Sequence, residues 1–96
     1  MKNMITISHA AKDKIIKDME KNPGMYFRIM FQGFGWGGPK LGLALEKPKK
    51  DEKPAKIDGL DLLVSDMVKN IADGSLVDHV SSIYGEQFII RANYSC

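Results

Sequence analysis

The sequence predicts an α+β fold with a mainly antiparallel sheet. Several segments alternate apolar and polar residues with a period of two, whereas two segments show the period of an amphipathic helix. These two helical segments do not alternate regularly with the strands, which argues against a doubly wound α/β fold. The 96 residues (1–96) are expected to form a single domain, and a domain this small is expected to bind ligands on loops or at an oligomer interface.

The first third of the chain predicts a strand, a helix and a second strand. A weak alternation over residues 4–7 leads into Ser8, a candidate helix N-cap. The helix that follows has an apolar residue every four positions, at Ala11, Ile15 and Met19. Pro23 and Gly24 end this helix. Residues 25–32 then place four apolar side chains on one face of a strand: Met25, Phe27, Ile29 and Phe31.

A further alternating run follows at Leu41, Leu43 and Leu45. The glycine-rich residues 33–39 between the two runs are therefore expected to form a strand-to-strand loop. Residues 46–56 contain two prolines, five lysines and three acidic residues without a period, which predicts an exposed, mobile connection. The next strand is expected to start near the Asp58-Gly59 turn and to end at Val64.

The remainder predicts a short helix and a hairpin. Ser65 and Asp66 suit a helix start, and Gly74 suits a C-cap. The core face of this helix is expected to consist of Met67, Val68, Ile71 and Ala72. The hairpin is expected to comprise a strand over residues 76–84, a tight turn at Gly85-Glu86 and a strand over residues 88–92.

Composition and charge exclude several function classes. The formal net charge of +2 is too small, and the lysines are too widely spread, for a nucleic-acid interface. No apolar run exceeds three residues, whereas a signal peptide needs about 7–15 and a membrane helix about 20. We therefore expect a soluble, cytoplasmic chain that binds neither nucleic acid nor membrane. The single cysteine excludes an intrachain disulfide and a four-cysteine metal site within one chain.

The glycine-rich loop is the most informative stretch. Glycine-dense turns occur where the backbone takes a positive φ or where another group approaches closely. Gly33, Gly35 and Gly38 fit the dinucleotide-binding spacing G-x-G-x-x-G, and Asp58 follows twenty residues after the last of them. That site requires a helix N-terminus after the loop, whereas the alternating leucines predict a strand. A dinucleotide site is therefore disfavoured, and the lysine and hydroxyl residues of a P-loop are absent.

Several polar and aromatic residues have both a structural and a functional interpretation. Phe34 and Trp36 can pack beneath the glycine loop or project from it, and composition favours packing. His9 and His79 have no metal-ligand spacing to a second ligand, so we expect surface or structural histidines. Asp78 is expected to orient His79 or to cap a turn.

No catalytic constellation follows from residue spacing. The sequence offers no defensible Ser-His-Asp, Cys-His or paired-carboxylate arrangement, so we predict no catalytic residue and no enzyme. Cys96 is the last residue, and a terminal thiol of this kind is accessible to a soft metal such as iron.

The order of these segments resembles the HesB-like, A-type iron–sulfur cluster assembly proteins over nearly the whole chain. The segments that carry the resemblance are Ile5-Thr6-Ile7-Ser8 before the first helix, Gly35-Trp36-Gly37-Gly38, Ile57-Asp58-Gly59-Leu60-Asp61-Leu62-Leu63-Val64, Val77-Asp78-His79-Val80, and Phe88-Ile89-Ile90 with Asn93. The resemblance implies a HesB-like β-sandwich or pseudobarrel with two flanking helices. It also implies IscA-like binding of iron or an iron–sulfur cluster by a loop cysteine and a C-terminal Cys-x-Cys pair, often across a homodimer. The implied partners are apo iron–sulfur client proteins or the assembly machinery.

Two positions depart from the family pattern. Trp36 stands at the position of the loop cysteine, and Cys96 is the only thiol. An indole N–H is a hydrogen-bond donor only and does not replace a thiolate. Residues 33–45 resemble a branch in which some members carry selenocysteine at the loop position, and its UGA codon is read as tryptophan by other decoding schemes. We therefore interpret Trp36 as the position of a native selenocysteine or cysteine, with Cys96 as the remaining metal ligand.

Three functions from different classes follow from these observations. The first, which we favour, is a non-enzymatic carrier of iron or an iron–sulfur cluster that exchanges ligands at position 36 and Cys96. The second is a redox protein in which a selenolate at position 36 forms a transient bond with Cys96. The third is a metal-free interaction module in which Phe34 and Trp36 are hydrophobic anchors.

Overall fold

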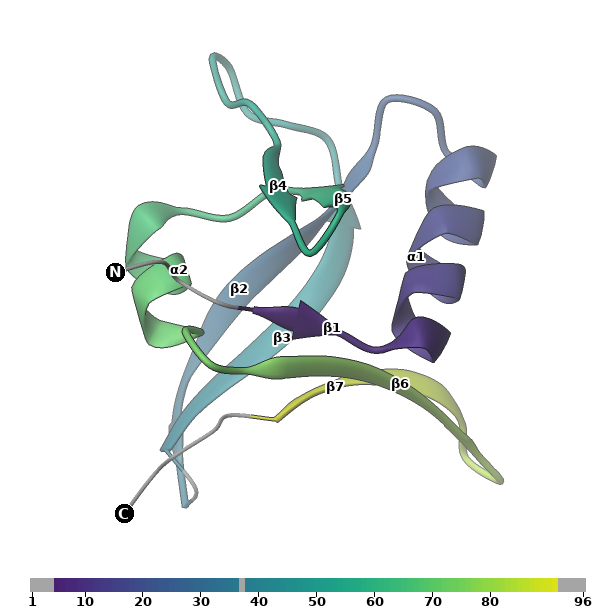
Figure 1. Ribbon diagram of the computed structural model, residues 1–96, viewed down its shortest axis with the longest axis vertical. Coiled ribbons are helices and arrows are strands. Elements are labelled where there is room, and N and C mark those ends of the chain that lie inside the picture. The colour runs from purple at the N-terminus through teal and green to yellow at the C-terminus, as the bar shows by residue number, and fades with distance from the viewer. Residues whose placement is uncertain (1–4, 37, 92–96) are drawn as a thin grey trace.

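The computed structural model describes residues 5–36 and 38–91, and Figure 1 labels their helices and strands. In chain order the elements are β1 (Thr6–Ile7), α1 (His9–Lys21), β2 (Tyr26–Gly35), β3 (Gly38–Glu46), β4 (Ala55–Ile57), β5 (Leu60–Leu62), α2 (Asp66–Ile71), β6 (Leu76–Ser82) and β7 (Gly85–Arg91). Both predicted N-caps are confirmed. The Ser8 hydroxyl accepts from the Ala11 N–H at 3.2 Å, and Ser65 accepts from Val68 at the same distance.

The strands form three small sheets that pack together. β1 lies parallel to β6, which pairs antiparallel with β7, while β2–β3 and β4–β5 are antiparallel hairpins. Backbone hydrogen bonds from Ile29 N to Leu63 O (3.0 Å) and from Leu63 N to Phe27 O (2.9 Å) connect the segment after β5 to β2. The predicted α+β class with mainly antiparallel pairing is confirmed, and β1–β6 is a parallel exception.

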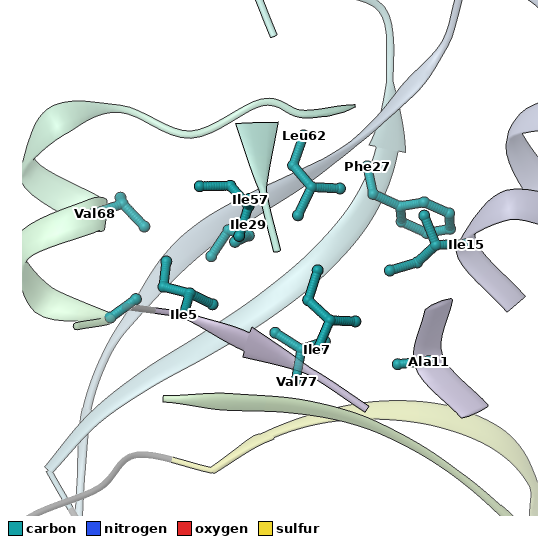
Figure 2. Close-up of a cluster of buried hydrophobic side chains, with 11 residues drawn as sticks. Ile5, Ile7, Ala11, Ile15, Phe27, Ile29, Ile57, Leu62, Val68 and Val77 are labelled. Atoms are coloured by element: carbon teal, nitrogen blue, oxygen red, sulfur yellow. The ribbon is translucent and has the colours of Figure 1, made fainter. Parts of the chain in front are cut away.

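The core lies between the sheets, α1 and α2. Figure 2 shows Ile15 of α1 pointing toward Phe27 of β2, and Ile7 of β1 beside its register partner Val77 of β6. The buried cluster consists of Ile5, Ile7, Ala11, Ile15, Phe27, Ile29, Ile57, Leu62, Val68, Ala72 and Val77. The alternation in β2 therefore predicts its buried residues correctly, because a strand sends successive side chains to opposite faces.

The predicted loop over residues 33–39 is shorter in the structure. β2 continues through Gly35 and β3 begins at Gly38, so most of the predicted loop is paired strand. Phe34 pairs with Pro39 and Gly35 with Gly38. Alternating leucines mark only the buried part of this hairpin, whereas its outer part extends into solvent and lacks that signal.

The prediction that residues 46–56 form an exposed, mobile connection is also wrong in part. β4 occupies Ala55–Ile57 and pairs with β5. The remainder is anchored because Arg28 of β2 binds the carboxylates of Glu46 and Glu52, at 2.6 Å in each case.

Other boundaries shift by a few residues. β5 ends at Leu62 instead of Val64, and the C-cap of α2 is Ala72, so Gly74 (φ +82°) lies beyond the helix. The last hairpin turns at Ile83-Tyr84 and not at Gly85-Glu86, because Ser82 pairs directly with Gly85. Met4 and Ala92, at the outer ends of two predicted strands, lie outside the described residues.

Candidate functional site

The turn between β2 and β3 presents position 36 to solvent. Trp36 directly follows the last paired residue of β2, Gly35, and its relative exposure of 107% is that of a side chain without covering neighbours. Figure 1 shows this turn at the bottom of the view, at the far end of the long hairpin. The residue is therefore accessible to another molecule.

A β-bulge precedes the turn. Three steps along β2, from Phe31 to Phe34, face two steps along β3, from Leu41 to Pro39, so β2 contains one extra residue. Gly33 lies in the bulge with φ +100°, a conformation that residues with a Cβ rarely adopt. The bulge redirects the side chains that follow it, and it requires glycine at one position of the predicted loop.

Phe34 and Trp36 project from the hairpin, so the interpretation that both pack beneath the loop is wrong. Phe34 is 79% exposed and touches Phe31 edge to face, with ring centroids 5.2 Å apart. This ring contact orients Phe34 without covering it. Sequence composition could not show this, because glycine-rich loops bury or expose their aromatic residues according to tertiary contacts.

Cross-strand side chains cover two glycines of the hairpin. A Cβ at Gly35 would lie 2.5 Å from Lys40 Cε, and a Cβ at Gly42 would lie 2.5 Å from Gln32 Nε2. The Lys40 side chain thus crosses the backbone next to position 36. The turn offers two aromatic rings, an indole N–H and an ammonium group, and none of these is a metal ligand.

Cys96, the other predicted site residue, lies outside the described residues. β7 runs beside β3 and ends at Arg91, five residues before Cys96 in the sequence. Among the described residues, no group of three or more His, Cys, Asp or Glu side chains could hold a metal ion. The structure therefore places position 36 and leaves the contribution of Cys96 as a prediction.

The two histidines differ in their surroundings. His9 is exposed on the first turn of α1. The His79 ring packs edge to face on Phe88, with centroids 5.0 Å apart. Asp78 accepts from the Ser8 hydroxyl at 2.7 Å and from the His79 backbone N–H at 2.8 Å, and these two bonds lower its pKa. Asp78 thus connects β6 to the N-terminus of α1 by accepting from a hydroxyl and a backbone N–H.

Arg28 forms contacts that no motif in the sequence predicts. Its guanidinium donates to Glu46 Oε1 (2.6 Å) and, through two nitrogens, to both carboxylate oxygens of Glu52 (2.6 and 2.7 Å). The Lys49 backbone N–H adds a bond of 2.8 Å to Glu52. The Arg28 bonds first, and then the Lys49 bond, lower the pKa of Glu52 to about 2, and the carboxylates raise the pKa of Arg28. The only signal in the sequence was a charged residue within a largely apolar strand.

Neither α1 nor α2 is long and apolar enough to span a bilayer, a statement that holds for residues 5–36 and 38–91.

Comparison with known proteins gives consistent similarities, although no family model matches the chain. The iron-sulfur cluster insertion protein ErpA of Alcanivorax borkumensis is 31% identical over 86 residues, which cover 88% of this chain and 72% of that protein. ErpA of Stenotrophomonas maltophilia is 32% identical over 87 residues, 90% of this chain and 67% of the relative.

Solved structures show the same fold. Escherichia coli SufA, described as involved in biosynthesis of iron-sulfur clusters, has a TM-score of 0.70 and 28% identity. The match covers 97% of this chain and 86% of SufA. IscA with a [2Fe-2S] cluster has a TM-score of 0.58 over 93% of this chain and 82% of that one, and at 22% identity it supports the fold alone.

Proposed function

Because this chain belongs to the A-type (HesB/IscA/ErpA) family of iron–sulfur cluster insertion proteins, we propose that it carries iron or an iron–sulfur cluster to apo-proteins in the cytoplasm. The family consists of carriers, not enzymes, in agreement with the absence of a catalytic constellation from the sequence analysis. The iron or cluster is the cargo, and the proposal concerns which residues of this chain hold it.

The exposure of position 36 is the observation that carries the proposal. The family resemblance assigns a cargo ligand to this position, and a carrier must present its cargo where a second protein can reach it. Trp36 is fully exposed at the end of a paired hairpin, so a thiol or selenol at the same position would be equally accessible. Soft, accessible ligands of this kind favour transfer by ligand exchange.

The chain as written provides few ligands for such a cargo. Trp36 has no lone pair to donate, and Cys96 is the only thiol in the sequence. A homodimer would bring two Cys96 thiolates to one cluster, which is half of a four-thiolate set. We therefore propose a dimer that binds cargo weakly with Trp36, and more tightly with a thiol or selenol at position 36.

The native residue at position 36 is part of the proposal. A selenocysteine there would restore a soft ligand, and its UGA codon explains tryptophan in a translated sequence. Intact-mass measurement of the protein from its own organism, under reducing and anaerobic conditions, tests this directly. A mass that fits selenocysteine or cysteine at position 36 is expected, and a mass that fits tryptophan would contradict this part of the proposal.

Anaerobic reconstitution with ferrous iron and sulfide tests cargo binding. We expect Trp36→Cys to bind more iron and sulfide per chain than the unchanged protein, with visible sulfur-to-iron charge-transfer absorption. Phe34→Cys is the matched control, because it adds one exposed thiol two residues away. Equal binding by the two variants would show that thiol number, and not position 36, decides binding. Loss of binding in Trp36→Cys/Cys96→Ser would support the role of Cys96.

A metal-free interaction module is the second candidate, and the exposure of both Phe34 and Trp36 favours it. Exposed aromatic residues commonly act as anchors at protein interfaces. In this case Trp36→Ala weakens binding to an immobilised apo iron–sulfur protein in the absence of iron, whereas Cys96→Ser has no effect. A carrier whose partner contact depends on cargo would bind the apo-protein only after it is loaded with iron and sulfide, and Cys96→Ser would weaken that binding.

A further inference from the structure

The loop between β3 and β4 carries a local excess of positive charge. Residues 47–53 contain four lysines, Asp51 and Glu52, which leaves ten basic and ten acidic residues in the rest of the sequence. The formal net charge of +2 therefore equals the charge of these seven residues. The side chains of Lys47, Lys49, Lys50 and Lys53 are exposed. Within the described residues, Lys47, Lys50 and Lys53 make no ion pair.

Arg28 removes an acidic group from the outer surface of this loop. Glu52 points back to β2, where Arg28 holds both of its carboxylate oxygens. The Glu52 side chain retains 21% of its exposure, and that of Arg28 retains 13%. Because the carboxylate is bound on the inner side, it does not pair with the lysines outside. Asp51 is the exposed acid that remains among them.

A backbone turn and two prolines also restrict the conformation of the loop. A backbone hydrogen bond from Glu52 N to Lys49 O (2.9 Å) closes a turn, with Lys50 and Asp51 at its centre. Pro48 and Pro54 fix the backbone φ on either side. A preorganised loop loses less conformational entropy on binding than a flexible lysine-rich tail.

We infer that residues 47–53 form a docking site for an acidic segment of a protein partner. Ammonium groups attract carboxylates over a Debye length of about 8–10 Å and accelerate encounter. The loop has no aromatic side chain on which a nucleic-acid base could stack. It also has no aromatic or large aliphatic side chain that could insert into a bilayer. A polypeptide with several glutamate or aspartate residues is the partner that fits best.

This docking site is far from the candidate cargo position. Figure 1 shows the β3–β4 loop at the top of the view and the β2–β3 turn at the bottom. β2 alone contributes ten residues between these ends, and a strand extends about 3.3 Å per residue. A partner bound at residues 47–53 thus leaves position 36 free. The inference does not depend on the proposed iron cargo.

Fluorescence anisotropy with a fluorescein-labelled oligoglutamate peptide tests the inference on the full, iron-free chain. We expect binding at about 0.02 M salt that weakens at about 0.15 M, as an exposed electrostatic contact should. Lys50→Gln/Lys53→Gln should weaken binding about fivefold, given that each exposed ion pair contributes modestly. Lys17→Gln/Lys21→Gln, with the same net charge and two exposed lysines of α1, is the matched control.

Three outcomes would overturn the inference. The first is absence of peptide binding at low salt. The second is equal weakening by the two double variants, which would mean that only net charge matters. The third is tighter, lysine-dependent binding of a single-stranded RNA or an anionic vesicle than of oligoglutamate. Circular dichroism of each variant checks that the fold is retained, and the exposed positions of all four lysines make retention the expected result.

Discussion

The two ends of the β2–β3 hairpin differ in how they are held. At the end near the β3–β4 loop, Arg28 binds Glu46 and Glu52, which lie 18 and 24 positions later in the sequence. At the turn, Phe34 has one ring contact and Trp36 is fully exposed. Both ends have hydrogen-bonded strand pairing, so they differ in their side-chain contacts.

Within one hairpin, the anchored end contributes to stability and the turn provides accessible side chains. The anchored end orders a loop that would otherwise have little reason to pack, because its residues are polar and carry two prolines. The exposed end leaves its side chains free for contact with another molecule. Changes at the anchored end should therefore affect folding, whereas changes at the turn should affect binding.

The largest effect is expected from the core face of β2, next to the anchored end of the hairpin. Ile29 is 2% exposed in the core, so Ile29→Ala should lower the free energy of unfolding by about 2–5 kcal/mol. Urea denaturation measures this value. Met30→Ala, on the opposite and only partly buried face of β2, is the control and should cost less. Equal costs would mean that Ile29 does not lie in a tightly packed core.

A smaller loss of stability is expected when the ion pairs of Arg28 with Glu46 and Glu52 are removed. Arg28→Gln leaves Glu46 and Glu52 close together without their cation, so the melting temperature should fall by a few degrees. Hydrogen exchange of the Glu52 amide should accelerate, because its bond to Lys49 depends on the same loop conformation. Unchanged exchange there, with a lower melting temperature, would show that Arg28 stabilises the strand but not the loop.

The ion pair between Arg28 and Glu52 also predicts that the stability of the fold depends on pH. Arg28 and the Lys49 amide lower the pKa of Glu52 from its ordinary 4.5 to about 2. Since the folded pKa lies below the unfolded one, the stabilisation by Glu52 is complete above about pH 5 and is lost as the pH falls through about 2. Glu52→Gln should therefore flatten the pH dependence of stability in this window. Glu20→Gln, an exposed glutamate of α1, should leave the slope unchanged.

Local signals predicted most of the fold. Ser8 and Ser65 were identifiable as N-caps from their positions before periodic segments, and alternation in β2 identified Phe27 and Ile29 as core residues. These features depend on residues a few positions apart, so a single sequence contains the necessary information.

Long-range contacts could not be predicted in this way. The pairing of Arg28 with Glu52 depends on how the β3–β4 loop returns across β2, and no local pattern encodes it. The bulge at Gly33 likewise changes which way Phe34 points. The candidate site was located by family resemblance at Trp36, whereas its exposure became apparent only from the hairpin geometry.

The smallest effect on stability is expected at Trp36. A side chain without covering neighbours contributes little to folding, so Trp36→Ala should change the free energy of unfolding by less than about 0.5 kcal/mol.

Because Trp36 is the only tryptophan, its fluorescence reports on this position alone. The folded protein should emit at nearly the same wavelength as the urea-unfolded chain and show similar quenching by acrylamide. A blue-shifted, protected emission would mean that another surface covers Trp36 in solution, for example in a dimer. Dilution would then restore the exposed spectrum if a second copy were the cover, and would leave it unchanged if the chain covered its own turn.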